Sequence, residues 1–332
     1  MHASVHDHPH RLELPPFTEA QLPLDPGALP AGPGVGQIVG PGGVSLVIGR
    51  AANLRRWAAG HLGGARPRKG QRPPTDLRPV AAAVRWAPTP GAFRQRLVFE
   101  RLMERHTAPG ARRDLKPPAF LHLDPGQRFP RLSVRVGPGR ADAFGPFLRR
   151  GDAEEAAQAV NRLFALRPCD YVFEPHPELP LGLGCLYAQT QACAAPCLAR
   201  VGEEAYRARA REAAGWLAAP ARRGDASLPA WVSAPGEARG LVVETAGGGC
   251  ALYPVRAWNV LEAGAVEAAA EPTEADVSAL GWAAPSAGTG DLPWLVAWLR
   301  APGRAAYVPV GEGEPPHAIA ARARAEIMRH TR

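Results

Sequence analysis

The alternation of apolar and polar residues along the chain predicts a mixed α+β protein built from several short elements. Residues 34–49 alternate apolar and small side chains on both sides of a Gly-Pro-Gly-Gly turn, which is the pattern of a β-hairpin. Residues 91–110 place apolar side chains at helical spacing and end at a Pro-Gly pair, as an amphipathic helix does. Further strands are predicted at 80–88, 119–124, 131–137, within 238–262 and at 305–310, and further helices at 51–64, 153–166, 202–219, 291–301 and 315–330.

These elements fall into groups separated by segments rich in proline, alanine and glycine. A chain of 332 residues is long enough for two or three small domains. Residues 1–30 show no hydrophobic period and are predicted to be a flexible tail. We expect domains at 31–115, 116–218 and 239–332, with 219–238 as a linker.

Positive charge is concentrated in one third of the chain. Residues 51–150 contain 21 Lys and Arg against six Asp and Glu, a net charge of +15, whereas the rest carries 18 against 25 and the total is +8. Almost all of the cations are arginine, the side chain suited to forked contacts with phosphate. Such a block is the electrostatic footprint expected of a nucleic-acid-binding protein. The alternative is a solvated face without a partner.

The same patterning argues against a membrane protein. No apolar run approaches the roughly 20 residues that a membrane helix needs. The first residues lack the apolar core of a secretory signal. We therefore expect a cytoplasmic protein with no membrane partner, in which thiols stay reduced and clustered cysteines more often bind metal or do redox chemistry than form disulfides.

Four of the five cysteines lie within one short segment. Cys169, Cys185, Cys193 and Cys197 follow the spacing C-x15-C-x7-C-x3-C, whereas Cys250 stands alone in a predicted strand and is expected to be a small buried residue. Four thiolates suit either a zinc site or an iron–sulfur cluster. The absence of paired C-x2-C knuckles favours the cluster, while zinc and ordinary reduced cysteines remain alternatives.

The words around these cysteines resemble a known family. "FALRPC" at 164–169, "CLYAQTQACAAPC" at 185–197 and the helix that follows are similar to the cysteine-rich segment of the UvrC and Cho-like excinucleases. "RFPRLSVRV" at 128–136 and "AFGPF" at 143–147 are similar to further blocks of that family. The resemblance covers about residues 31–218. It implies the N-terminal half of a UvrC-like protein, with a [4Fe–4S] cluster on the four cysteines.

The resemblance also implies that residues 31–115 form a GIY-YIG nuclease domain, a small mixed sheet with flanking helices. In that family a tyrosine activates or positions the attacking water, a glutamate binds one divalent metal ion, and an arginine stabilises the developing charge. Here the two motif tyrosines are replaced by Gly36 and Val47, and the arginine by Trp57. His61 stands where the family has a further tyrosine. The motif is therefore degenerate.

Some parts of the motif are kept. Arg50 retains the basic residue after the second motif, and Glu100 aligns with the metal-binding glutamate, with Glu104 as an alternative. A rearranged site would use His61 as base, Arg50 or Arg56 to stabilise charge, and Glu100 to hold Mg²⁺ or Mn²⁺. The protein would then be an endonuclease that makes a single 3′-side incision in nucleotide excision repair.

We favour a second hypothesis, in which DNA binding is kept and catalysis is weak or lost. A base and an arginine are each typically worth about 10²–10⁴-fold, and this chain lacks both at the expected positions. The expected partners are DNA and other excision-repair proteins. A third hypothesis, an interaction protein without nucleic acid, conflicts with the basic block. The predicted DNA contacts flank the start of the first helix and fill the loop after it: Arg55, Arg56, Arg66, Arg68, Lys69 and Arg72.

Overall fold

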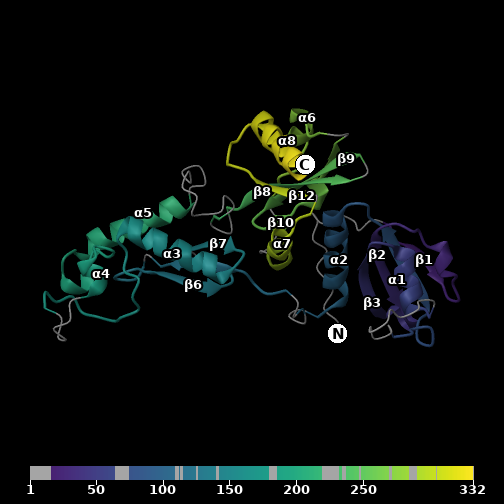
Figure 1. Ribbon diagram of the computed structural model, residues 1–332, viewed down its shortest axis with the longest axis horizontal. Helices are drawn as coiled ribbons and strands as arrows, with labels where there is room; N and C mark the ends of the chain where they lie inside the picture. The colour runs from purple at the N-terminus through teal and green to yellow at the C-terminus, as the bar shows by residue number, and fades with distance from the viewer. Residues whose placement is uncertain are drawn as a thin grey trace.

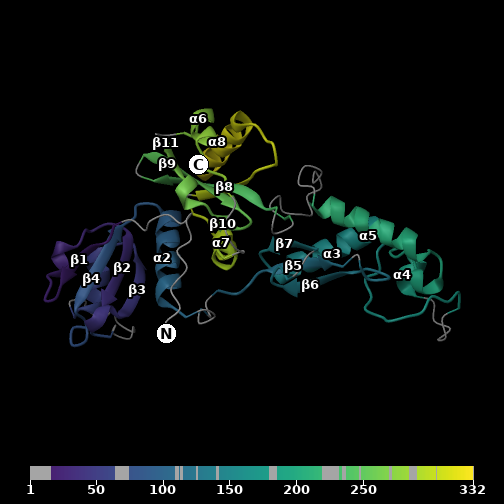
Figure 2. The same ribbon diagram turned by 180° about the vertical axis from the view of Figure 1, so that it is seen from behind.

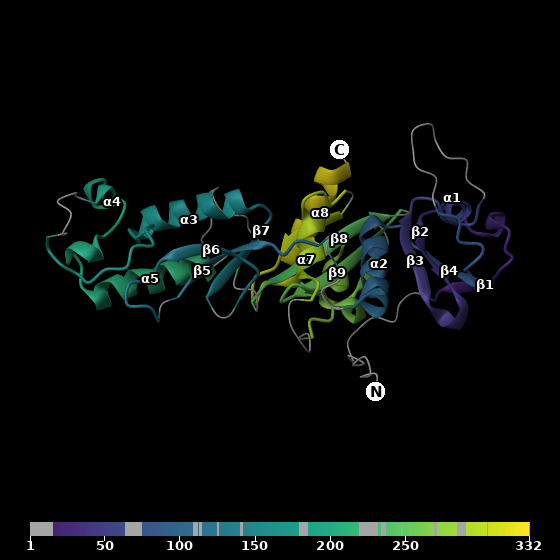
Figure 3. The same ribbon diagram turned by 90° about the horizontal axis from the view of Figure 1, so that it is seen from below.

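The computed structural model has the α+β fold that the sequence predicts. It describes residues 16–331, except 64–74, 109–111, 113–114, 125, 140–141, 179–184, 219–231, 234–236, 247, 269–270, 284–289 and 304. Within these residues there are three antiparallel sheets, each accompanied by helices. The first sheet and the middle domain lie at opposite ends of the molecule, and the C-terminal domain lies between them (Figures 1 and 3). No helix of the described part is long and apolar enough to cross a membrane.

The first sheet has the strand order β1-β4-β2-β3. The predicted hairpin is confirmed as β2 and β3, and its turn uses two glycines with positive φ, Gly42 and Gly43. The elements of this domain are β1 (Thr18–Gln21), β2 (Gly34–Val39), β3 (Ser45–Ala51), α1 (Leu54–His61), β4 (Ala83–Pro88) and α2 (Ala92–His106).

The structure differs from the sequence prediction in three respects in this domain, of which the first is that all described strand pairs of the sheet are antiparallel, where a mixed sheet was expected. Thr18–Gln21 lies within the predicted flexible tail, yet it pairs along its length with β4, and Leu29 is fully buried. Because most side chains of β1 are exposed, the strand carries no hydrophobic pattern, and its backbone pairing with β4 holds it. The first helix begins at Leu54 because Ala51 still pairs with Gly34, and the Asn53 side chain caps the helix.

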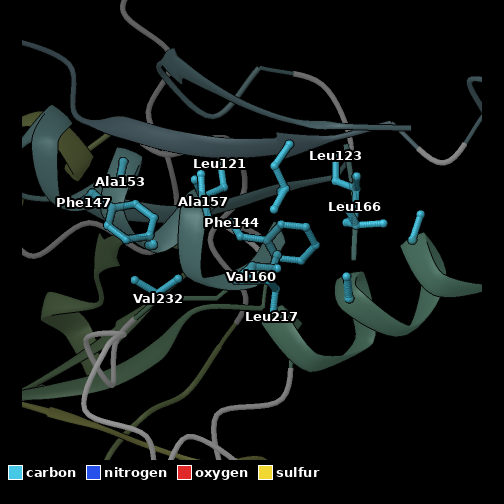
Figure 4. Close-up of a cluster of buried hydrophobic side chains, with 14 of the residues drawn as sticks. Leu121, Leu123, Phe144, Phe147, Ala153, Ala157, Val160, Leu166, Leu217 and Val232 are labelled. Atoms are coloured by element: carbon cyan, nitrogen blue, oxygen red, sulfur yellow. The ribbon is translucent and has the colours of Figure 1, made fainter. Parts of the chain in front are cut away.

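The middle domain is a three-stranded sheet of order β6-β5-β7 covered by two helices. Its core joins the inner faces of the strands to α3 and α5, with Leu121, Phe144 and Val160 among the central side chains (Figure 4). The elements are β5 (Ala119–Leu123), β6 (Leu132–Val136), β7 (Ala143–Phe147), α3 (Arg150–Phe164), α4 (Leu186–Gln189) and α5 (Glu203–Ala218).

The C-terminal domain is built on a sheet of order β10-β9-β8-β12, with β11 paired to β9. The terminal helix packs across β8 and β12 and against α6. The elements are β8 (Arg239–Ala246), β9 (Gly249–Arg256), β10 (Asn259–Val260), β11 (Val266–Ala268), α6 (Glu274–Ser278), α7 (Leu292–Leu299), β12 (Ala305–Pro309) and α8 (Pro316–Thr331). Cys250 is buried in β9, as the sequence predicts.

Helix α2 joins the first domain to the C-terminal domain, which is visible where α2 runs beside α7 (Figure 2). The Glu244 carboxylate accepts hydrogen bonds from the backbone N–H groups of Phe93 and Arg94 at the start of α2, at 2.5 and 3.1 Å. The Phe93 ring packs against Trp294 and Trp298 of α7. A helix N-terminus favours a carboxylate, so this contact fixes α2 to a strand some 150 residues later in the chain.

A second polar contact lies further along α2. The guanidinium group of Arg101 pairs with Glu262 at 2.6 Å and with Asp291, and all three residues are buried. Asp291 also accepts hydrogen bonds from the Val260 N–H and the Trp294 indole N–H. Two carboxylates thus share one buried cation. Burial, opposed by Arg101 and reinforced by Asp291, raises the pKa of Glu262 to about 7.

This pKa predicts that the stability of the contact between α2 and the C-terminal domain depends on pH. The ordinary pKa of this carboxyl group is 4.5, and in the folded chain it is about 7, so the group binds its proton more tightly when the chain is folded. Its stabilising contribution is therefore complete below pH 4.5 and is lost as pH rises to 7. We expect about 3 kcal/mol of unfolding free energy to be lost across this window. Glu262→Gln should flatten that part of the profile, as measured by urea unfolding at pH 5 and pH 8. An unchanged slope in the variant would contradict the assignment.

Candidate nucleic-acid interface and cysteine site

The two faces of the first sheet carry different side chains because successive strand residues point to opposite sides. Val35 pairs with Arg50 across β2 and β3, and Val35 packs with residues of α2. Gly36 pairs with Gly49 on the other face, which packs against α1 through Ile38 and its neighbours. The sheet is thus covered by α1 on one face and by α2 on the other.

On the α1 face, the indole of Trp57 lies directly over the Gly36–Gly49 pair. A Cβ atom added to Gly36 would stand 2.2 Å from a ring carbon of Trp57, and one added to Gly49 would stand 2.4 Å from the indole nitrogen. Val47 packs in the same apolar cluster. The three positions where the nuclease family keeps its tyrosines and its arginine therefore lie in one apolar region, in which Trp57 covers Gly36 and Val47 packs against the same cluster.

His61 belongs to this α1 face as well. Its ring meets the Trp57 ring edge-on, with 5.3 Å between centroids. Burial lowers the pKa of His61, so the imidazole is neutral at neutral pH. Its nearest described aromatic partner is an indole, and α1 is separated from α2 by the sheet. The structure therefore does not bring His61 together with Glu100.

Glu100 lies on the α2 face and is 2% exposed. One carboxylate oxygen is 2.5 Å from Arg96 Nε and the other is 2.8 Å from an Arg112 guanidinium nitrogen. Arg50 is close enough to be affected by all three groups: burial, Arg96 and Arg112 lower its pKa, and Glu100 raises it. Of the predicted catalytic residues, only Glu100 and Arg50 are brought together.

Sequence reasoning missed Arg96 and Arg112. Arg96 stands four residues before Glu100 on α2, a spacing at which helical side chains meet, so this partner could have been found. Arg112 follows the end of the helix and carried no comparable signal. The alternative glutamate, Glu104, is half-exposed and lies 3.7 Å from Arg101.

The predicted DNA contacts are described only in part. Arg55 and Arg56 are exposed in the first turn of α1, and the Arg55 guanidinium donates to the Leu29 carbonyl at 3.1 Å. The remaining four, Arg66, Arg68, Lys69 and Arg72, lie outside the described residues.

The contact between Trp57 and the glycine pair can be tested by a double-mutant cycle. Gly36→Ala should lower the free energy of unfolding by about 1–3 kcal/mol, because its methyl group overlaps the indole. In a Trp57→Ala background the same substitution should have little effect, giving a coupling energy within the roughly 0.5–3 kcal/mol seen for touching residues. Gly60→Ala on α1 meets open space and serves as the control. Equal losses in both backgrounds would contradict the contact.

The sequence blocks of the middle domain that resemble the UvrC/Cho family meet around Arg167. Its backbone N–H donates to the Tyr206 hydroxyl at 2.6 Å, and its guanidinium donates to the Phe129 carbonyl at 3.0 Å and the Tyr171 carbonyl at 2.7 Å. The Arg167 guanidinium also lies over the Phe173 ring. Residues from the "RFPRLSVRV" block, the "FALRPC" block and α5 thus fix the backbone that leads to the first cysteine of the segment.

The four clustered cysteines lie at the same end of this domain. Cys193 and Cys197 are buried, and Cys169 and Cys185 are half-buried. Burial raises the pKa of Cys193 to about 11, helped by Cys169, Cys197 and Cys185, while the Ala195 N–H, 3.3 Å from its Sγ, lowers it. In the described part of the chain, no three Cys, His, Asp or Glu side chains are close enough as they stand to hold a metal ion. The thiols are nevertheless near enough to influence one another.

Comparison with known proteins finds similarity to the same family as the sequence motifs do. Residues 119–216 match the family described as the UvrC/Cho excinuclease middle domain. UvrABC system protein C of Alkalilimnicola ehrlichii is 30% identical over 212 residues, covering 60% of this chain and 33% of that protein. The protein of the same name from Coxiella burnetii is 27% identical over 187 residues, covering 56% and 30%, and that from Corynebacterium diphtheriae is 30% identical over 191 residues, covering 55% and 27%.

These matches are partial. The chain spans about a third of the length of the curated relatives it matches. No solved structure matches it. The match includes β5 to α5 and the four clustered cysteines, whose flanking residues converge on Arg167 and Tyr206. In this middle domain, and more weakly over just over half of its length, the chain resembles the UvrC/Cho excinuclease family.

Proposed function

We propose that this chain is a nucleotide-excision-repair-related protein that binds DNA through its basic first domain and has weak or no nuclease activity. The similarity to UvrABC system protein C supports a role in repair. The net charge of +15 over residues 51–150 supports DNA as the ligand. By the name of these relatives, its protein partners would be other components of a UvrABC system.

The observation that carries the loss of catalysis is the Trp57 indole on the Gly36–Gly49 pair. Gly36, Val47 and Trp57 themselves offer no side chain that can take a proton from water or stabilise a phosphorane, and His61 on the same face is separated by the sheet from Glu100. Both oxygens of Glu100 face guanidinium groups, so a divalent cation at this carboxylate would have to displace an arginine. These residues do not fit a Mg²⁺ site. Activity as an endonuclease is therefore the alternative that a cleavage assay would reveal.

The test of DNA binding uses the full chain with duplex DNA in a fluorescence anisotropy titration. We expect affinity to fall steeply with salt, with a slope of about −0.9 in log–log form for each phosphate contacted. Reversing the charge of Arg66, Arg68 and Lys69 together should weaken binding to all duplexes alike and flatten the slope.

The matched control reverses three exposed arginines of the middle domain: Arg162, Arg200 and Arg209. The control changes the total charge by the same amount but should retain most of the affinity. Equal losses of DNA affinity in both triple variants would mean that binding depends on the net charge of the chain and not on the basic loop. Absence of salt-dependent binding in the unaltered chain would favour an interaction protein without nucleic acid.

We also propose that Cys169, Cys185, Cys193 and Cys197 hold a [4Fe–4S] cluster. The four thiols form the donor set of such a cluster, and the Ala195 N–H already donates to one of the sulfurs. Burial now raises the pKa of Cys193 and of Cys197, and the positive charge of a bound metal centre would offset this penalty on their thiolates. The cluster would staple the loops between α3 and α5. Stoichiometric zinc without iron would assign the site to the alternative metal.

A further inference from the structure

The α2 face of the first sheet gathers three arginines around a single carboxylate. Arg50 comes from β3, Arg96 from α2 and Arg112 from the segment after α2, and they surround Glu100. Three positive charges and one negative charge give this group a net charge of +2. The Glu100 side chain is 2% exposed and those of Arg96 and Arg112 are 16% and 17% exposed, so the uncompensated charge reaches solvent mainly through Arg50.

The nearest acidic group on the same helix does not complete the charge balance. Glu104 lies beside Arg101, whose buried guanidinium also pairs with Glu262 and Asp291. The charges that act on Arg50 are those of Arg96, Glu100 and Arg112. In the described part of the chain the side chain of Arg50 makes no ion pair or side-chain hydrogen bond, and it is partly open to solvent.

The arginines are held in place before any ligand arrives. Glu100 fixes Arg96 and Arg112 at 2.5 and 2.8 Å. The ring of Phe99 is flanked by Arg50 and Arg112, whose guanidinium carbons lie 5.5 and 5.7 Å from its centroid. Guanidinium groups fixed in this way lose little freedom on binding and present paired N–H donors, which suit the oxygens of a phosphate.

We propose that Arg50, Arg96 and Arg112 form a phosphate-binding clamp that needs no metal ion. Arg96 and Arg112 pair with the Glu100 carboxylate, which a nuclease would instead use to bind its metal cation. Resting on the proposed function, the ligand is a phosphodiester of bound DNA. Arg50 is the free arm of the clamp, and Glu100 orders the other two arms.

The first test compares Arg50→Ala with Arg105→Ala. Both side chains are exposed on the first domain, but Arg105 lies outside the cluster on α2. Arg50→Ala should weaken duplex binding by about tenfold at moderate salt and reduce the log–log salt slope by about 0.9, as loss of one phosphate contact does. Arg105→Ala should leave both values near those of the unaltered chain. Identical behaviour of the two variants overturns the clamp.

The second test uses Glu100→Gln and EDTA. Removal of the single negative charge should strengthen DNA binding and steepen its salt dependence, and EDTA should change nothing. A metal-ligand role for Glu100 gives the opposite result, with binding weakened by the substitution and by EDTA. Thermal unfolding of the variant checks that the fold is kept without the charge of Glu100. Arg50→Ala tests the clamp independently, because the Arg50 side chain has no ion pair in the described structure and packs on Phe99 alone among the described aromatic rings.

Inorganic pyrophosphate, titrated by calorimetry, separates the clamp from the proposed function. Binding of pyrophosphate that is lost in Arg50→Ala, in a chain that does not bind DNA, would keep the clamp as a site for a free phosphate and overturn the DNA-binding proposal. DNA binding that is unaffected by Arg50→Ala would keep the function and overturn the clamp. Loss of both ligands in the variant supports both.

Discussion

Arg101→Ala is expected to lower the free energy of unfolding by about 3–5 kcal/mol, the effect of breaking a buried ion pair from one side. Asp291 and Glu262 would then lie buried without their cation, and among the described residues Asp291 would keep the hydrogen bonds from Val260 and Trp294 alone. Urea unfolding followed by tryptophan fluorescence suits the measurement, since the Trp294 indole donates to Asp291 at this contact.

Arg105→Ala on the same helix is the matched control, because that side chain is exposed and should change stability by no more than about 0.5 kcal/mol. A loss in Arg101→Ala as small as in the control would mean that α2 is not anchored to the C-terminal domain through this cation. A large loss would also explain why the C-terminal domain accompanies the first domain in one chain, since its acidic residues complete the packing of α2.

Cys193→Ser is expected to remove all of the bound iron, if the proposed cluster is present. Cluster-replete protein purified without oxygen should be brown and contain about four irons per chain. Cys250→Ser is the matched control, because Cys250 is equally buried but lies in β9 of another domain. Iron and visible absorbance should be unchanged there.

Retention of iron in Cys193→Ser, or loss of iron in Cys250→Ser, would contradict the assignment of ligands. The segment should also lose thermal stability when the cluster is lost, because metal binding and folding are coupled in such sites. Proteolysis of the loops between α3 and α5 gives a second readout that does not depend on the colour of the cluster.

Local patterns predicted much of the fold, because they act over a few residues. The β2–β3 hairpin follows from its alternation and its glycine turn, and the long helices follow from apolar spacing. Strand β1 was missed because its stability comes from pairing with β4, more than 60 residues later, and not from its own side chains. The capping of α2 by Glu244 could not be predicted either, since no local feature of the two segments indicates that they are in contact.

The candidate site was predicted in composition but not in arrangement. The sequence identified Trp57 as the replacement of an arginine, but only the structure places its ring on Gly36 and Gly49. The sequence suggested a rearranged site with His61 as the base and Glu100 as the metal ligand, whereas the structure puts their helices on opposite faces of the sheet. Which face a residue takes depends on the pairing register, which motif spacing alone does not reveal.

The most direct test of the central claim is a cleavage assay with cluster-replete protein, on nicked, bubbled and damaged duplexes with Mg²⁺ or Mn²⁺. The account predicts that these substrates are bound and not cut, or are cut far below one turnover, because Trp57 fills the motif face and Glu100 is held by Arg96 and Arg112. Multiple-turnover nicking that is abolished by Glu100→Gln would contradict it.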